Sequence, residues 1–189
     1  KVRQTNSTAV TAFSNISFDS MVEWNDEYRL HVMYPITEQS HLNLLAKAKI
    51  DTYVTDFKKQ VAEKPKGGEP YELNIKGVVN YASKTAVNFV YSGSQFTGGQ
   101  KQNVTVNALF DRISGKEIQT ADLFKNSTYL QVMSDSVRKA LPDILGTMNY
   151  NKTLVEQGTT PSAKHFSQFE IKDAQTIHII FEPGQVATS

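Results

Sequence analysis

Apolar and polar residues alternate along several stretches of the chain, and this period of two predicts β-strands. In the N-terminal part the alternation is broken over residues 13–24 and regular over residues 28–34. The broken stretch predicts a bulged strand and the regular one a second strand. Pro35 is expected to end the second strand, because proline has no N–H to give to the ladder.

Further strands are predicted over residues 71–81, 85–96 and 104–113. They are separated by short turn signals, so we interpret them as an antiparallel meander. Near the C-terminus, residues 166–171 and 176–181 predict two short strands.

Two segments change to a spacing of three and four residues, which is typical of an amphipathic helix. The first runs over residues 40–63, with Ser40 as the expected N-cap and a Pro- and Gly-rich loop after it. The second runs over residues 129–145, and Pro142 is expected to kink or end it. Residues 146–164 are polar and irregular, and they predict a lid-like loop.

Together these elements predict an α+β fold in which antiparallel sheets carry long amphipathic helices on one face. Each half of the chain shows strands beside one long helix, which indicates two related small subdomains. We expect a polar leader at residues 1–9, an N-terminal subdomain at 10–100 and a C-terminal subdomain at 101–189.

Charge and composition exclude several classes of protein. The chain has 20 Lys and Arg against 19 Asp and Glu, so it carries no field that would gather nucleic acid. Cysteine is absent, which excludes disulfides and thiolate chemistry. No apolar stretch approaches the roughly 20 residues of a membrane span. The chain begins at Lys1, and we expect it to be a fragment whose anchor or catalytic partner lies outside it.

No catalytic motif is visible in the sequence. His31, His41, His165 and His178 are scattered without the spacing of metal ligands. There is no nucleophile elbow and no glycine-rich phosphate loop. We therefore expect neither catalysis, nor a cofactor, nor a metal in this chain.

Aromatic residues are the first candidates for binding a sugar. Trp24, Tyr28, Tyr34, Tyr91 and Phe96 could each present a ring to a glycan. Alternation assigns most of them an inward face, however, and we expect them to be core residues.

The connection after the fourth predicted strand is the second candidate for a ligand site. It contains Phe96, Gly98, Gly99, Gln100 and Lys101, and exposes backbone amides and amide side chains suited to sugar hydroxyls or a protein edge. The alternative is a plain solvated connection between strands.

A second turn is expected to be structural. Asp111 and Ser114 can bond nearby amides, and Gly115 can supply a positive φ ahead of Lys116. We expect these four residues to form the hairpin turn of the second half.

Several stretches resemble a family of extracellular bacterial domains first catalogued as having unknown function. Residues 110–116 (FDRISGK) and 121–124 (ADLF) are similar to its F-D-x-x-T/S-G-K…L-x-D-L-F signature. They are preceded by Gly98-Gly99 and followed by Tyr129-Leu130, as in that family. The family usually reads Gly-Gly-Ala-His where this chain has Gln100 and Lys101, so the role of that Ala-His does not transfer.

Two further stretches resemble the ends of the paired domains. Residues 34–36 (YPI) before the long helix are similar to the companion N-terminal domain, and residues 179–187 (IIFEPGQVA) to the closing strand. The Gly-Gln-Val-Ala ending resembles the form found ahead of polysaccharide deacetylase domains in Gram-positive bacteria.

The resemblance implies a secreted or membrane-anchored cell-envelope protein. Such domains form the non-catalytic N-terminal region of peptidoglycan N-acetylglucosamine deacetylases and the ectodomain of lysozyme-sensing anti-sigma factors. The deacetylase motifs T-F-D-D-G and H-x-x-[S/T]-H are absent here, so catalysis would reside in another domain of the same full-length chain.

Three hypotheses follow. The chain is an accessory module that positions or tethers a deacetylase near cell-wall glycan, a passive spacer, or a sensor that binds a protein ligand. The Gly-Gln-Val-Ala ending favours the first hypothesis over the third.

Overall fold

The chain forms two compact units, Lys1–Glu117 and Ile118–Ser189. The division predicted after residue 100 is wrong, because it falls in the turn between two strands that pair with each other. The leader expected at residues 1–9 lies outside the described part of the chain. The computed structural model describes Phe13 and residues 15–63, 68–173, 175–182 and 184–187.

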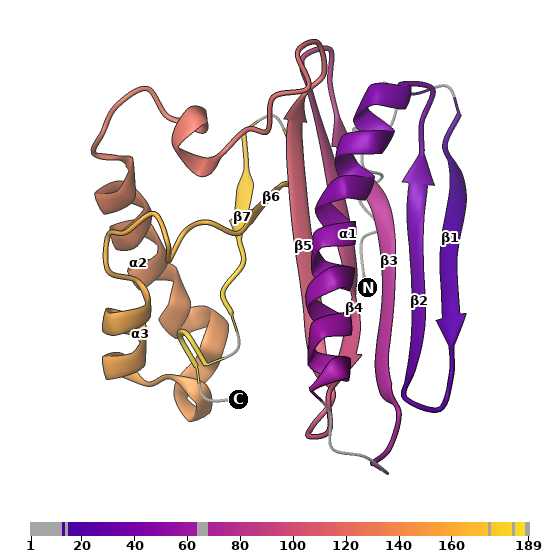
Figure 1. Cartoon of the computed structure of the whole chain (residues 1–189). Coiled ribbons are helices and arrows are strands. Elements are labelled where there is room, and N and C mark those ends of the chain that lie inside the picture. Colours follow the sequence, from indigo (N-terminus) through magenta and orange to yellow (C-terminus); the bar gives the residue numbers. More distant parts are fainter. Residues whose placement is uncertain (1–12, 14, 64–67, 174, 183, 188–189) are drawn as a thin grey trace, which may run out of the picture. The chain divides into compact units, whose positions relative to one another are not determined.

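The first unit is a five-stranded sheet with one long helix across it (Figure 1). The strands lie in chain order, and all neighbours are antiparallel except β2 and β3. The elements are β1 (Ser17–Trp24), β2 (Tyr28–Ile36), α1 (Ser40–Ala62), β3 (Tyr71–Ala82), β4 (Ala86–Phe96) and β5 (Gln102–Asp111).

The parallel pair is the one departure from the expected antiparallel sheet. Helix α1 connects β2 to β3, and a chain that crosses over through a helix returns in the same direction. The five-stranded sheet, the second small sheet and the helices together confirm the α+β class.

Two expectations about the ends of elements are wrong. Strand β2 continues through Pro35 to Ile36, because its pairing with β3 ends at Met33 and the missing N–H costs no bond there. Ser40 does not cap α1, which follows Gln39 without a side-chain cap. Asn43 instead fixes the entry to the helix, since its side chain accepts from the Thr37 amide at 3.0 Å and donates to the Thr37 carbonyl at 2.8 Å.

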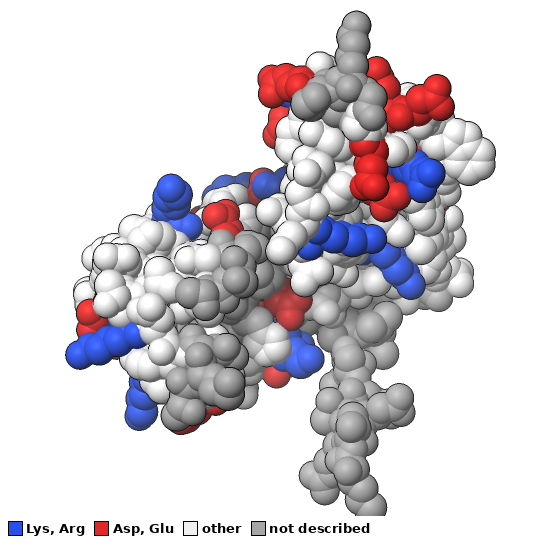
Figure 2. Space-filling view, turned by 90° about the horizontal axis from the view of Figure 1, so that it is seen from below, with Lys and Arg blue, Asp and Glu red and all other residues white. Residues whose placement is uncertain are grey.

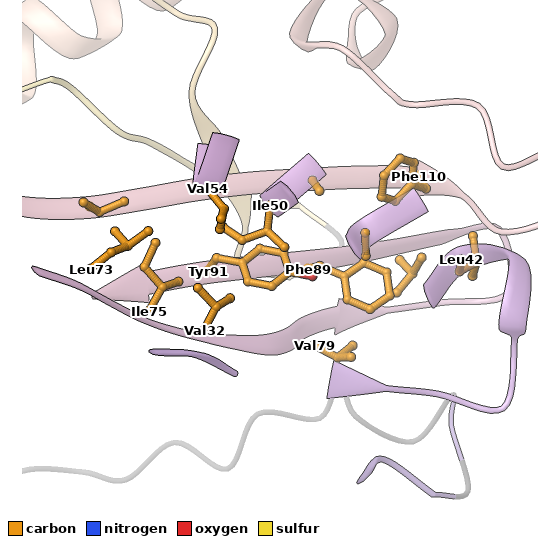
Figure 3. Close-up of a cluster of buried hydrophobic side chains, with 14 of the residues drawn as sticks. Val32, Leu42, Ile50, Val54, Leu73, Ile75, Val79, Phe89, Tyr91 and Phe110 are labelled. Atoms are coloured by element: carbon orange, nitrogen blue, oxygen red, sulfur yellow. The ribbon is translucent and has the colours of Figure 1, made fainter. Parts of the chain in front are cut away.

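The core of the first unit lies between α1 and the sheet. Phe57 of α1 and Phe89 and Tyr91 of β4 are fully buried there, and Figure 3 shows the rings of β4 among aliphatic side chains of α1, β2 and β3. Burial raises the pKa of the Tyr91 hydroxyl. The stripe of α1 that faces this core has the predicted three-and-four spacing: Leu42, Ala46, Ile50, Val54, Phe57 and Val61.

The second unit combines helices with a two-stranded hairpin. Leu141, Val155 and Val186 form a small core of their own. Arg138 links the two longer helices of this unit, since it donates to the Glu156 carbonyl at 2.9 Å. The elements are η2 (Thr120–Leu123), α2 (Tyr129–Asn149), α3 (Lys152–Gly158), β6 (Phe169–Ile171) and β7 (Ile177–Ile179).

The polar segment predicted as a lid-like loop over residues 146–164 contains α3. Asn151 begins this helix by accepting from the Leu154 amide at 3.2 Å. Pro142 lies inside α2 and does not end it; the helical backbone breaks at Gly146, which has φ 66° and ψ 171°.

Candidate functional site

The loop expected to bind a ligand is the turn between β4 and β5. Gly98 in this turn has φ +90°, and a Cβ there would lie 3.2 Å from the Tyr71 hydroxyl. Tyr71 in turn meets Phe96 edge to face, with ring centroids 6.4 Å apart. A side chain at Gly99 would meet nothing within 4 Å, so this part of the turn is open.

The two ends of this turn line a shallow pocket of about 410 Å³. Phe96 and Lys101 lie there with Arg29 of β2 and Glu72 of β3. Gly98, Gly99 and Gln100 are not among its lining residues. The structure therefore brings two of the five predicted loop residues against side chains from other strands.

A second shallow pocket, of about 300 Å³, adjoins the first and shares Arg29 and Glu72 with it. Its side chains come from β1, β2 and β3, so the two pockets form one surface on the sheet. We name this surface the outer sheet face and define it by Val22, Trp24, Arg29, His31, Glu72, Asn74, Phe96 and Lys101.

Strand register assembles the outer sheet face. Trp24 is the partner of Arg29, Arg29 of Glu72, and Glu72 of Phe96, which places four side chains in one row across four strands. Partners in register point to the same side of a sheet, and alternate residues point to opposite sides. Leu30, next to Arg29, accordingly points into the core and is buried.

A second row lies two residues along the strands. Val22 is the partner of His31, and His31 is the partner of Asn74. This row adds an aliphatic side chain, an imidazole and an amide beside the first row, so that apolar surface and hydrogen-bonding groups alternate across the face.

Trp24 is the most exposed large apolar side chain of this face, with 80% of its surface accessible. The expectation that it is a core residue is wrong: it lies on the edge strand, and α1 covers the opposite side of the sheet. Its neighbour Arg29 forms an ion pair with Glu72 at 3.3 Å. The pair is exposed, and water and salt weaken such pairs, so it leaves the face adaptable.

The other aromatic candidates serve the sheet itself. Tyr91 is fully buried, as expected of a core residue. Tyr28 and Tyr34 are half-buried and donate their hydroxyls to Glu23 at 2.6 Å and to Asp19 at 3.2 Å. The bond to Glu23 raises the pKa of Tyr28, because it stabilises the protonated phenol.

The turn after β5 is held together by its own side chains and lies in the first unit, not in the second half of the fold. The Asp111 carboxylate accepts from the Ser114 amide at 2.7 Å and from its hydroxyl at 2.8 Å. These bonds lower the pKa of Asp111. Gly115 has φ +71°, and the Lys116 amide donates to the Ser114 hydroxyl oxygen at 3.3 Å.

The histidines occupy separate places. His31 lies on the outer sheet face, His41 bonds the Arg112 carbonyl, His165 bonds Thr160, and His178 meets Glu170 at 3.0 Å. In the part of the chain that the structure describes, no three His, Cys, Asp or Glu side chains gather as metal ligands would.

The second unit carries a larger concavity of different chemistry. It has a volume of about 760 Å³ and is lined mainly by apolar side chains of α2 and of residues 177–181. Val132 and Ile144 at its rim are more than half exposed. An apolar groove of this kind lacks the dense hydrogen-bonding groups that sugar hydroxyls require.

Charges of both signs line the first pocket, because Arg29 and Lys101 lie there with Glu69 and Glu72. On the side shown in Figure 2, acidic side chains gather near the top of the view, and basic side chains lie scattered over several other places. No helix in the described residues is both long and apolar enough to cross a bilayer.

No family model matches the chain. It is 24% identical over 183 residues to the peptidoglycan-N-acetylmuramic acid deacetylase PdaC of Bacillus subtilis strain 168. The match covers 93% of this chain and 38% of the deacetylase. The chain thus spans well under half of that relative, whose name specifies N-acetylmuramic acid where the sequence resemblance pointed to N-acetylglucosamine.

Solved structures show that the fold is shared. A member of the DUF3298 family from Bacteroides fragilis NCTC 9343 superposes with a TM-score of 0.60 at 14% identity, over 96% of this chain and 87% of that one. A DUF3298 protein from Pseudomonas aeruginosa PAO1 gives a TM-score of 0.46 at 13% identity over 72% of each chain.

Proposed function

We propose that the chain is a non-catalytic accessory module of a cell-wall peptidoglycan deacetylase and that its outer sheet face binds glycan. The catalytic domain then lies elsewhere in the full-length protein, at the cell envelope of a Gram-positive bacterium. The likeness to a deacetylase more than twice as long supports this arrangement. The main support for glycan binding is the exposed ring of Trp24, which lies beside polar side chains of β2 and β3.

The chemistry of the face suits a sugar ring. One side of a pyranose presents C–H groups, which pack against the flat apolar surface of an indole. Arg29 can donate to sugar oxygens, Asn74 can donate and accept, and His31 can do either according to its tautomer. The face is shallow and open, so it suits a stretch of polymer better than an enclosed small molecule.

Glycan binding by this module would act on catalysis through local concentration. A domain joined to the module by the same chain meets the polymer as an intramolecular partner, at an effective concentration that reaches the millimolar range with a short linker. The proposed benefit to the deacetylase is therefore more frequent encounter with substrate and not a change in its chemistry.

Co-sedimentation with insoluble peptidoglycan tests the binding role. We expect the wild-type chain to pellet with the polymer and the Trp24→Ala variant to lose most of that binding. The Leu44→Ala variant should bind like wild type. Leu44 is a matched control because it is also an exposed apolar residue, 69% accessible, but lies on α1. Equal binding by Trp24→Ala would show that the outer sheet face is not the site.

The double variant Gln100→Ala/Lys101→Ala separates the turn from the rest of the face. Lys101 lines the first pocket and Gln100 does not, so we expect a smaller loss than for Trp24→Ala. Since the charges of the face are few and mixed, binding should also weaken little between low and high salt.

A second assay tests the non-catalytic part of the proposal. The purified chain should release no acetate from peptidoglycan or chitooligosaccharide, with or without added divalent metal. Deacetylation that a chelator abolishes would contradict it.

One observation favours a protein ligand as the second candidate. Trp and Arg are the residue types most enriched in protein–protein hot spots, and Trp24 and Arg29 are neighbours on this face. The sensor hypothesis predicts that lysozyme, and not peptidoglycan, binds the wild-type chain and that Trp24→Ala abolishes this. Binding to neither would leave the spacer hypothesis.

A further inference from the structure

Strand β1 is at the end of the five-stranded sheet, so one of its two edges has no neighbour among the described strands. Natural edge strands are usually protected against pairing with another chain by charged side chains, especially lysine, by proline, by a bulge or by short length. Strand β1 is eight residues long, contains neither lysine nor proline, and pairs with β2 without a break in register. Its two charged residues, Asp19 and Glu23, are already bonded within the copy, to Tyr34 and to Lys58. Its open edge is therefore suited to accept another strand.

The ladder with β2 determines which residues face the open edge. The Asn25 amide donates to the Tyr28 carbonyl at 2.9 Å, and bonds alternate along an antiparallel ladder. Odd-numbered residues of β1 therefore bond β2, and Phe18, Ser20, Val22 and Trp24 direct their backbone groups outward. The Ser20 amide agrees with this phase, since it donates to the neighbouring Asp19 carboxylate at 2.8 Å and not to β2.

The open edge is complementary to itself. If two copies pair antiparallel about Ser20, Phe18 of each lies opposite Val22 of the other, on the outer side of the sheet. These side chains are 50% and 58% exposed in one copy, and the pairing would bury both. Pairing about Met21 would oppose Asp19 to Glu23, and pairing about Asp19 would oppose two aspartates, so charge disfavours the two neighbouring registers.

We propose that two copies of the chain associate through β1 in this register and form one continuous sheet. The two-fold axis is then perpendicular to the sheet, which puts the outer faces of both copies on the same side. An interface of two edge strands is small, so the dimer dissociates on dilution. This association of two copies does not depend on glycan binding.

Sedimentation velocity over a range of concentrations tests the dimer. We expect the weight-average sedimentation coefficient of the wild-type chain to rise toward that of a dimer with concentration. Val22→Lys puts a charged side chain in place of the apolar partner of Phe18 in both pairs and should keep the chain monomeric. Leu44→Lys, which makes the same kind of change on α1, should dimerise like wild type.

Ser20→Pro and amide exchange test the same interface without introducing a charge. The Ser20 amide forms no bond with β2, so proline there removes a dimer bond and none of the ladder. In the wild type, the amides of Ser20 and Val22 should be protected from exchange at high concentration and exposed on dilution. A monomer at every concentration, dimers unaffected by both variants, or protection at every dilution would overturn the proposal.

Discussion

Glu23 and Trp24 are neighbours in β1, yet they belong to two different surfaces of the same sheet. Glu23 points toward α1, where its carboxylate accepts from Lys58 at 2.7 Å and from the Tyr28 hydroxyl at 2.6 Å. Trp24 points away from the helix and is 80% exposed. One covered face and one open face are thus built from alternate residues of the same strands.

This difference separates stability from recognition. The covered face buries aliphatic and aromatic side chains and supplies most of the hydrophobic stabilisation of the first unit. On the outer sheet face, substitutions remove little buried surface, so they can change binding without unfolding the protein. Substitutions on the two faces should therefore differ sharply in their effect on the free energy of unfolding.

The largest effect is expected in the core on the covered face. Phe57 of α1 is fully buried against the sheet and packs edge to face with Tyr28, with ring centroids 6.2 Å apart. Phe57→Ala should lower the free energy of unfolding by about 3–5 kcal/mol, because it leaves a cavity. Urea titration followed by circular dichroism measures this, and a loss of about 1 kcal/mol or less would show that the covered face is not the main core.

A smaller loss is expected at the turn after β5. Gly115 has φ +71°, and a Cβ there would lie 2.9 Å from Leu45 Cδ1 of α1. Gly115→Val should therefore destabilise the chain by at least about 1–2 kcal/mol. Gly99→Ala is the control, since a Cβ at Gly99 meets nothing within 4 Å. Equal melting temperatures for the two variants would contradict the structural role of this turn.

A pH dependence is expected from Glu23. The bond from Lys58 is the main cause of a lowered pKa at Glu23, followed by the bond from Tyr28. A carboxyl with a lowered folded-state pKa stabilises the fold at pH values above its unfolded pKa, about 4.3, and loses that contribution as the pH falls through the folded value. The melting temperature of wild type should exceed that of Glu23→Gln modestly at pH 7, and the difference should vanish in acid. A difference that stays constant from pH 7 to pH 3 would contradict this.

The smallest effect on stability is expected on the outer sheet face. Trp24→Ala should change the free energy of unfolding by no more than about 0.5 kcal/mol, because the indole is mostly exposed already. Calorimetry of this variant beside Phe57→Ala compares the two faces directly. A loss of several kcal/mol at Trp24 would show that the outer face is part of a core.

The helix and most strands could be predicted from the sequence because their signals are local. The spacing of Leu42, Ile50 and Phe57 requires only the chain around them to show a helical stripe. Helix α3 was missed because seven residues of mainly polar sequence carry no such stripe, although Asn151 is a recognisable N-cap.

The outer sheet face could not be predicted, because it depends on contacts between distant strands. Nothing near Arg29 indicates that Glu72 will lie beside it; the parallel register of β2 and β3 decides that. Alternation shows that Trp24 and Glu23 point to opposite sides, but not which side α1 covers. The boundary predicted after residue 100 was wrong for the same reason. The Gly98-Gly99 turn signal does not show that the strands on its two sides, β4 and β5, pair with each other.

The most direct test of the account uses the fluorescence of Trp24, which is the single tryptophan of the chain. Its exposed indole should emit at long wavelength in the free protein, and titration with soluble peptidoglycan fragments should shift this emission to the blue in a saturable way. The same titration of the Leu44→Ala variant should give the same curve. An unchanged emission spectrum under conditions where the chain co-sediments with peptidoglycan would contradict the account, because the glycan would then bind away from the outer sheet face.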